Sequence, residues 1–255
     1  MISIDSYAYT SKLSNSNPSE KLIFAILSMF VCIYSNSPYV PILILFIMSF
    51  AAIIKGGISP SLFFKFMCIP FSFLIIALLT IAIITLDGSS IPIFSIKFFN
   101  LYIGSTRDSL NQAFIMLFKS LGAISCLYFL SLSTPMTYII LALKKFKVPK
   151  LFVELMTLVY KFIFVLLDTA SKIFLAQNSR LGYNSFRLSM KSLALLSSNL
   201  FIKSYKRSQD TYTALEARGY EGDLDVVSRE DFSTFLSMKK ILLVEILLFL
   251  AAHFI

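Results

Sequence analysis

The sequence predicts an all-α membrane protein, and three observations support this fold class. Of the 255 residues, 57% are hydrophobic and only 15% are charged, whereas soluble domains carry roughly 25% charged residues. The mean hydropathy is +0.79. The apolar residues also gather in runs separated by polar segments. We therefore expect about five transmembrane helices plus a cytoplasmic-side domain of amphipathic helices.

Four of the predicted transmembrane helices fall within residues 1–143, and the last occupies 239–255. The first two runs are shorter than the ~20 residues that a span needs, so flanking residues must complete a tight hairpin. Between the third and fourth spans, Pro92 and Lys97 interrupt the apolar stretch 91–103, which we expect to lie at the membrane interface or to form a hairpin. The five predicted runs are 22–34, 39–54, 66–86, 112–132 and 241–255.

Residues 144–238 form the predicted cytoplasmic domain, because lysine and arginine concentrate there and positive loops stay inside. Residues 151–177 have helical periodicity, and charged side chains from Glu154 to Lys172 share one face that we expect to be solvated. Residues 185–216 are expected to be two amphipathic helices with a break at Asn199. The pattern favours a multi-pass protein of a bacterial plasma membrane.

The sequence offers little support for catalytic or metal chemistry. It contains no glycine-rich phosphate loop and no paired cysteine or histidine spacing. Its one histidine, His253, lies in the terminal apolar run, and its three cysteines are expected to be small buried hydrophobic residues. We predict a non-catalytic subunit that has no cofactor, catalytic residue or metal ligand and binds no nucleic acid.

Two arginine motifs are the most distinctive feature of the cytoplasmic region. Ala217, Arg218 and Gly219 end one predicted helix, and Arg180 and Gly182 end another, with a tyrosine after each glycine. Glycine permits the left-handed conformation that stops a helix, and arginine suits the negative end of the helix dipole. A single copy is explained by simple helix capping, whereas two copies favour docking of a partner through bidentate hydrogen bonds.

These motifs resemble the transmembrane T component of energy-coupling factor (ECF) transporters, and most closely the CbiQ type of cobalt uptake systems. The resemblance runs from about residue 119 to 222 and also includes Thr134-Pro135, Val148-Pro149 and Tyr160-Lys161-Phe162. It implies a subunit that binds two ABC-type ATPases and a substrate-binding membrane subunit, and that transmits ATP-driven movement between them. It implies that Arg180, Gly182, Ala217, Arg218 and Gly219 form the ATPase-docking residues.

Other functions fit parts of the same sequence. Lys119 and Asp168 could serve as intramembrane coupling charges of a self-contained secondary transporter. Lys119 could equally reach the membrane interface along its flexible stem. A membrane scaffold or signalling protein is a third alternative. Within the ECF hypothesis, nickel or a vitamin could replace cobalt as the substrate.

Overall fold

The structure is a computed structural model that describes residues 4–82, 84–85, 94–98, 101–220, 232–235 and 238–254. The chain divides into two compact units, which we call the bundle unit and the hairpin unit. The bundle unit comprises Met1–Ala142 and Arg229–Ile255, and the hairpin unit comprises Leu143–Ser228. The described residues 232–235 thus belong to the bundle unit, whereas the sequence places them in the cytoplasmic domain.

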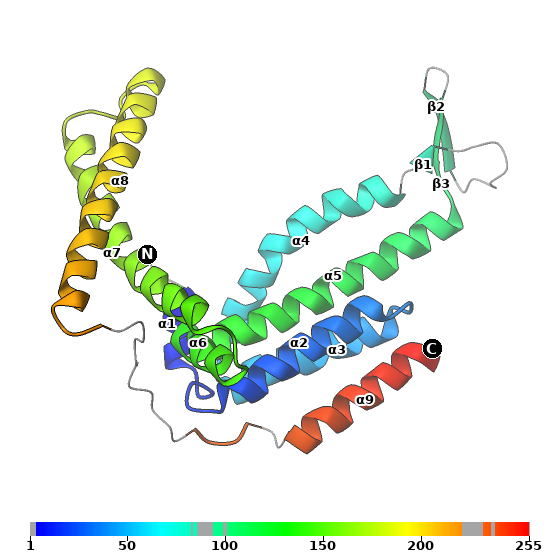
Figure 1. The fold of residues 1–255 in the computed structure, drawn as a ribbon. Coiled ribbons are helices and arrows are strands. Elements are labelled where there is room, and N and C mark those ends of the chain that lie inside the picture. Colours follow the sequence, from blue (N-terminus) through cyan, green and yellow to red (C-terminus); the bar gives the residue numbers. More distant parts are fainter. Residues whose placement is uncertain are drawn as a thin grey trace. The chain divides into compact units, whose positions relative to one another are not determined.

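The prediction of a helical membrane protein is confirmed, and helices occupy each of the five predicted spans. A short helix, α1, precedes them, and α6 leads from the bundle unit into the hairpin unit (Figure 1). The helices of this part of the chain are α1 (Ile4–Thr10), α2 (Pro18–Tyr34), α3 (Tyr39–Phe50) with its π-helical continuation η1 (Ala51–Lys55), α4 (Pro60–Ala82), α5 (Arg107–Ser133), α6 (Met136–Lys145) and α9 (Met238–Phe254).

A small antiparallel sheet lies between α4 and α5. Its strands are β1 (Ile84–Thr85), β2 (Phe94–Phe98) and β3 (Leu101–Ser105), in the order β1-β3-β2. β2 and β3 pair in a hairpin register that sets Ile96 opposite Ile103. Of the two alternatives for the stretch 91–103, the hairpin is therefore the one that the described residues adopt.

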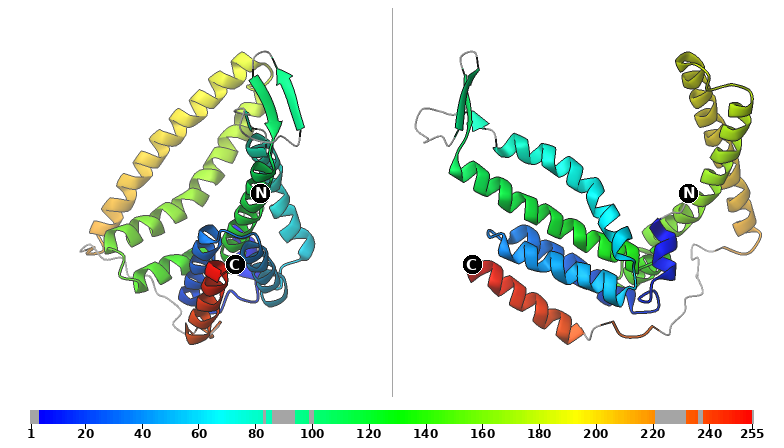
Figure 2. Two further views of the ribbon diagram at one scale, coloured as in Figure 1. Left: turned by 90° about the vertical axis from the view of Figure 1, so that its right-hand side faces the viewer. Right: turned by 180° about the vertical axis from the view of Figure 1, so that it is seen from behind.

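The bundle unit is organised around α5, which packs against α1, α2, α3 and α4 (Figures 1 and 2). Close approach is possible because α5 presents small residues to its neighbours, as membrane helices commonly do. At Gly122, an added Cβ would lie 2.7 Å from Cys32 Sγ and 3.0 Å from the Pro41 carbonyl oxygen. Ser125 and Cys126 continue this buried face one turn further along. Gly122 thus sets the distance between α5 and the α2–α3 pair.

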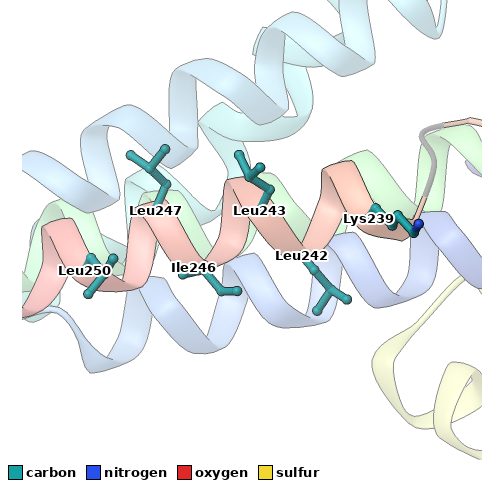
Figure 3. Close-up of a pocket in the computed structure, with 6 residues that line it drawn as sticks. All are labelled: Lys239, Leu242, Leu243, Ile246, Leu247 and Leu250. Carbon is teal, nitrogen blue, oxygen red and sulfur yellow. The ribbon is translucent and has the colours of Figure 1, made fainter.

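α9 buries one face against the bundle and exposes another. Ile241, Leu248 and Ala252 are buried where α9 packs on α2 and α3, and so is Glu245, whose Oε1 accepts from the Ser28 hydroxyl of α2. The opposite face is exposed and apolar, with Lys239 at its amino-terminal end; it carries Leu242, Leu243, Ile246, Leu247 and Leu250 (Figure 3). A continuous exposed apolar face of this kind is typical of a surface that contacts lipid or another apolar surface. Among the described helices, α4 and α5 are by themselves long and apolar enough to cross a membrane.

Replacing Gly122 by valine should destabilise the bundle unit by roughly 1–3 kcal/mol, because the side chain must displace Cys32 and the backbone at Pro41. Thermal unfolding in detergent should show a lower Tm than the wild type. Leu127→Val on the exposed face of the same helix is the matched control and should leave Tm nearly unchanged. An unaltered Tm for Gly122→Val would contradict the close packing.

Candidate functional site

The hairpin unit carries both arginine motifs on two long antiparallel helices. α7 (Lys150–Ser179) and α8 (Phe186–Glu216) pack along each other and are joined by a short turn (Figure 2). The predicted break at Asn199 is wrong, because α8 continues through it as one helix. An asparagine inside a helix costs only a few tenths of a kcal/mol relative to better helix formers, which 31 helical residues readily offset.

The two arginine motifs end their helices with the same hydrogen-bond pattern. After α8, the Tyr220 N–H donates to the Leu215 carbonyl and the Gly219 N–H to that of Glu216, both at 3.0 Å. After α7, the N–H groups of residues 182 and 181 donate to the carbonyls of residues 177 and 178, at 2.9 and 3.0 Å. Both are Schellman turns, in which one residue takes a left-handed conformation.

The left-handed residue differs between the turns. It is Gly219 after α8, with φ of 73°, but Leu181 after α7, with φ of 58°. Arg218 and Arg180 each come directly before this residue, so the two arginines occupy the same position in their hydrogen-bonded turns. The two glycines, which look equivalent in the sequence, occupy successive positions of the turn. A leucine at positive φ is strained, and such strain is concentrated at functional sites.

Gly182 is required for a different reason, which is the close approach of α8 to the turn. An added Cβ there would lie 2.7 Å from Ser192 Oγ and 2.9 Å from the Gln177 carbonyl oxygen. The Ser192 hydroxyl donates to the Gly182 carbonyl at 2.8 Å. Any side chain at 182 would therefore push the first turns of α8 away from the end of α7.

Gln177 is the centre of the hydrogen bonds that fix the Arg180 turn. Its Nε2 donates to the Ser192 carbonyl at 3.0 Å, and its Oε1 accepts from the Tyr183 hydroxyl at 2.8 Å. The Tyr183 ring also packs on Phe174, with 4.7 Å between centroids. Tyr183 thus braces the turn. Sequence reasoning missed Gln177 and Ser192, because nothing in the local pattern pairs residues fifteen positions apart.

At the other end of the hairpin, Tyr220 ties the end of α8 to the second turn of α7. Its hydroxyl donates to Glu154 Oε2 at 2.8 Å. Glu154 is 9% exposed, so its prediction as part of a solvated face is wrong, although Lys161 on that face is exposed. A carboxylate that accepts a hydrogen bond from a tyrosine can be buried at much lower cost than an isolated one.

The two arginines consequently lie at opposite ends of the hairpin. The contact between Tyr220 and Glu154 places Arg218 beside the start of α7, and Arg180 follows its end. Between residues 154 and 180 the helix axis extends by roughly 40 Å at 1.5 Å per residue. Both arginines and Ala217 are exposed.

The Arg180 turn also presents exposed apolar side chains. Leu181 is 68% exposed and Phe186, which begins α8, is 84% exposed. Arginine beside exposed aromatic and aliphatic residues is the composition found at the energetic centres of protein interfaces. Neither residue stood out in the sequence, because single exposed apolar residues are common in an apolar chain.

Asp168 and Lys119, the two charges considered for a secondary transporter, lie in different units, and neither is fully buried within its own unit. Asp168 Oδ2 accepts from Lys172 Nζ at 2.7 Å, and both side chains are well exposed on α7. Lys119 is half-buried on α5, where its carbonyl accepts from the Cys32 thiol at 3.4 Å. Cys32 and Cys126 are buried free thiols, as predicted, whereas Cys68 is exposed. The side chain of His253 lies outside the described residues.

Comparison with known proteins identifies the family. A family model described as CbiQ, cobalt transport protein, matches residues 9–228. The chain belongs to the CbiQ family. The resemblance predicted from the arginine motifs is therefore confirmed. The CbiQ match also reaches into α1 and thus includes the amino-terminal helices, which lie outside the resemblance seen in the sequence between about residues 119 and 222.

Three relatives illustrate the range of this family. A protein of Methanocorpusculum labreanum, named as a fused cobalt transport protein CbiMQ, is 32% identical over 247 residues, covering 96% of this chain and 41% of that protein. The cobalt transport protein CbiQ of Salmonella typhimurium is 33% identical over 159 residues, 62% of this chain and 71% of that protein. The energy-coupling factor transporter transmembrane protein EcfT of Staphylococcus aureus is 28% identical over 227 residues, 82% and 79% respectively.

Opposite substitutions at the two left-handed positions should change hairpin stability in opposite directions. Gly219→Ala should destabilise the α8 end by about 1–2 kcal/mol, because φ is 73° although an added Cβ would meet no described atom within 4 Å. Leu181→Gly should stabilise the α7 end by roughly 0.5–1 kcal/mol, since strain relief exceeds the entropy cost of glycine. Amide hydrogen exchange at each turn measures both effects, and changes of the same sign would contradict this assignment.

Removing the Tyr220 hydroxyl should loosen the other end of the hairpin. Tyr220→Phe loses the hydrogen bond to Glu154, which should cost roughly 1–3 kcal/mol because the acceptor is a buried carboxylate. Faster hydrogen exchange in the last turn of α8 would report the change. Tyr205→Phe, which loses an exposed contact to Gln209, is the control and should leave exchange there unaltered.

Proposed function

We propose that this chain is the transmembrane coupling subunit of an ECF-type importer. It binds two cytosolic ABC-type ATPases through the Arg180 and Arg218 turns and transmits their ATP-driven movement to a substrate-binding membrane subunit. It is a multi-pass protein of the plasma membrane with the hairpin unit on the cytoplasmic side. The chain itself is non-catalytic, and its partners hydrolyse the ATP.

The observation that carries the proposal is the repeated arginine turn at both ends of one rigid hairpin. Each arginine follows the last turn of a helix and precedes a left-handed residue, so its side chain projects from a fixed backbone. Arginine can form bidentate hydrogen bonds to carboxylates or grip backbone carbonyls in a partner's groove. Two such turns about 40 Å apart along the helix axis suit two ATPase subunits, with one turn docked on each.

Bracing of the turns supports this role energetically. Association is costly when loops must be ordered on binding, and pre-organised contacts avoid that cost. Gln177 and Tyr183 hold the Arg180 turn, and Tyr220 holds the Arg218 turn against α7. A rigid hairpin also transmits displacement, whereas a flexible one would absorb it.

Cobalt is the substrate that the relatives favour. The family description and the Salmonella relative both name cobalt transport. The match covers 41% of the fused CbiMQ protein, so that protein has a further part outside the match. We propose that a separate membrane subunit binds the substrate. Uptake of radioactive cobalt, competed by nickel or by vitamins, distinguishes the possible substrates.

Reversing the charge of both arginines tests the docking role. Arg180→Glu with Arg218→Glu should remove the co-purifying ATPases almost completely, because an arginine at an interface hot spot contributes about 2 kcal/mol or more. The matched control is Lys203→Glu with Lys206→Glu, which makes the same charge change on the exposed middle of α8. The control should retain the ATPases and transport.

Three results would argue against this function. Retention of ATPases by the double arginine variant would exclude docking through these turns. Uptake driven by an ion gradient without ATP would favour a secondary transporter. Absence of any ATP-dependent uptake by the reconstituted wild-type complex would favour a scaffold or signalling role.

A further inference from the structure

The chain leaves the bundle unit for the hairpin unit through α6, and α1 holds the start of that helix. Asp5 Oδ1 accepts a hydrogen bond from the N–H of Met136, the first residue of α6, at 3.3 Å. The hydroxyls of Tyr9 and Thr137 form a second hydrogen bond at 3.1 Å. An anionic acceptor suits this place, because the first N–H groups of a helix lack partners within it.

The chain returns to the bundle unit at residues 232–235, and the segment between α1 and α2, together with the first turn of α2, holds it there. The Asn17 N–H donates to the Ser233 carbonyl at 2.8 Å, and the Ser233 N–H donates to the Asn15 carbonyl at 3.0 Å. Glu20 Oε2 accepts from the Phe235 N–H at 2.8 Å. Three backbone groups of the returning chain are thereby fixed before α9 begins.

Aromatic packing secures the returning chain and connects it to α6. The Phe235 ring lies 6.2 Å from that of Phe24 and 5.9 Å from that of Phe129, measured between centroids. Phe232 meets the Tyr138 ring of α6 edge-on at 5.2 Å. The departing and returning chain therefore contact each other as well as the amino-terminal segment.

The amino-terminal segment is itself fixed to the bundle helices. The Ser11 hydroxyl donates to the Gly56 carbonyl at 2.9 Å, beyond the end of η1. Lys21 has 0% exposure, and its Nζ donates to the Leu13 carbonyl at 2.8 Å and to the Ser133 carbonyl, at the end of α5, at 3.0 Å. The segment is thus bonded to several bundle elements at once.

We propose that residues 4–21 form a clamp that transfers displacement of the hairpin unit into the bundle. Asp5 positions α6 and Glu20 positions the returning chain. Both connections between the two units are therefore bonded to the same segment, residues 4–21. Without the clamp, residues 232–235 would lose these bonds to the bundle. A displacement of the hairpin unit would then move this segment and would not reach the bundle helices. This inference rests on the proposed coupling function and adds an element that lies outside both arginine turns.

Replacing Glu20 separates coupling from docking. In vesicles containing the chain with its ATPases and substrate-binding subunit, Glu20→Ala should reduce cobalt uptake per ATP hydrolysed by roughly tenfold, because the part-buried Phe235 N–H loses its acceptor. ATPase co-purification and hydrolysis should stay at wild-type levels. Glu20→Gln keeps an acceptor oxygen and should recover most of the uptake. Asp108→Ala, an exposed acid in the first turn of α5, is the matched control and should transport normally.

A cross-link tests the same contact without relying on loss of function. The backbones of Ser16 and Ser233 form an isolated parallel β-bridge, and their hydroxyl oxygens are 3.5 Å apart. Cysteines at both positions should therefore form a disulfide under mild oxidation. In the Glu20→Ala background this cross-link should restore uptake, whereas either cysteine alone should not.

Wild-type uptake by Glu20→Ala, failure of the cross-link to restore uptake, or loss of ATPases from Glu20→Ala would each overturn the clamp. If instead the wild-type chain retains no ATPases, the coupling function fails as a whole. Efficient cross-linking between positions 16 and 233 in that case would still support the geometry of the clamp.

Discussion

Lys21 is a fully buried cation at the end of the bundle unit where the chain leaves for the hairpin unit and returns from it. Removing an ammonium from water is costly unless hydrogen bonds replace its hydration. Here two backbone carbonyls do so, one before α2 and one at the end of α5, where the helix dipole is negative. This bond fixes the amino-terminal segment to α5 just before Thr134 and Pro135, which lead into α6. The same amino-terminal segment contacts α6 through Asp5 and the returning chain through Glu20.

The hairpin unit solves a different problem, which is to hold two arginines rigidly without a core of its own. Its long helices leave most side chains exposed, so tertiary burial contributes little. Hydrogen bonds at the two ends replace it, through Gln177 at one end and through Tyr220 and Glu154 at the other. The strained Leu181 persists because this network holds it. Rigidity is therefore concentrated where the partners are proposed to bind.

Much of the fold follows from local pattern. The apolar runs, the polar breaks between them and the basic region placed the helices of the membrane bundle and of α7 close to their observed positions. The arginine motifs also indicated the family, because each motif is a short run of neighbouring residues. The prediction was wrong where a local signal was weak, as at Asn199, through which α8 continues as one helix. Similar motifs also concealed different roles: Gly219 takes the left-handed conformation, whereas Gly182 allows the close approach of α8.

The sequence by itself determined the helical membrane class and the two exposed arginines, because hydrophobic runs and helix-ending residues act over a few neighbouring positions. Only the tertiary structure decided that Lys21 and Glu154 are buried, that Arg180 and Arg218 lie at opposite ends of one hairpin, and that residues 232–235 return to the bundle. The bond from Glu20 to Phe235 joins residues 215 positions apart. Such partners are selected by packing of whole elements, which no local pattern records.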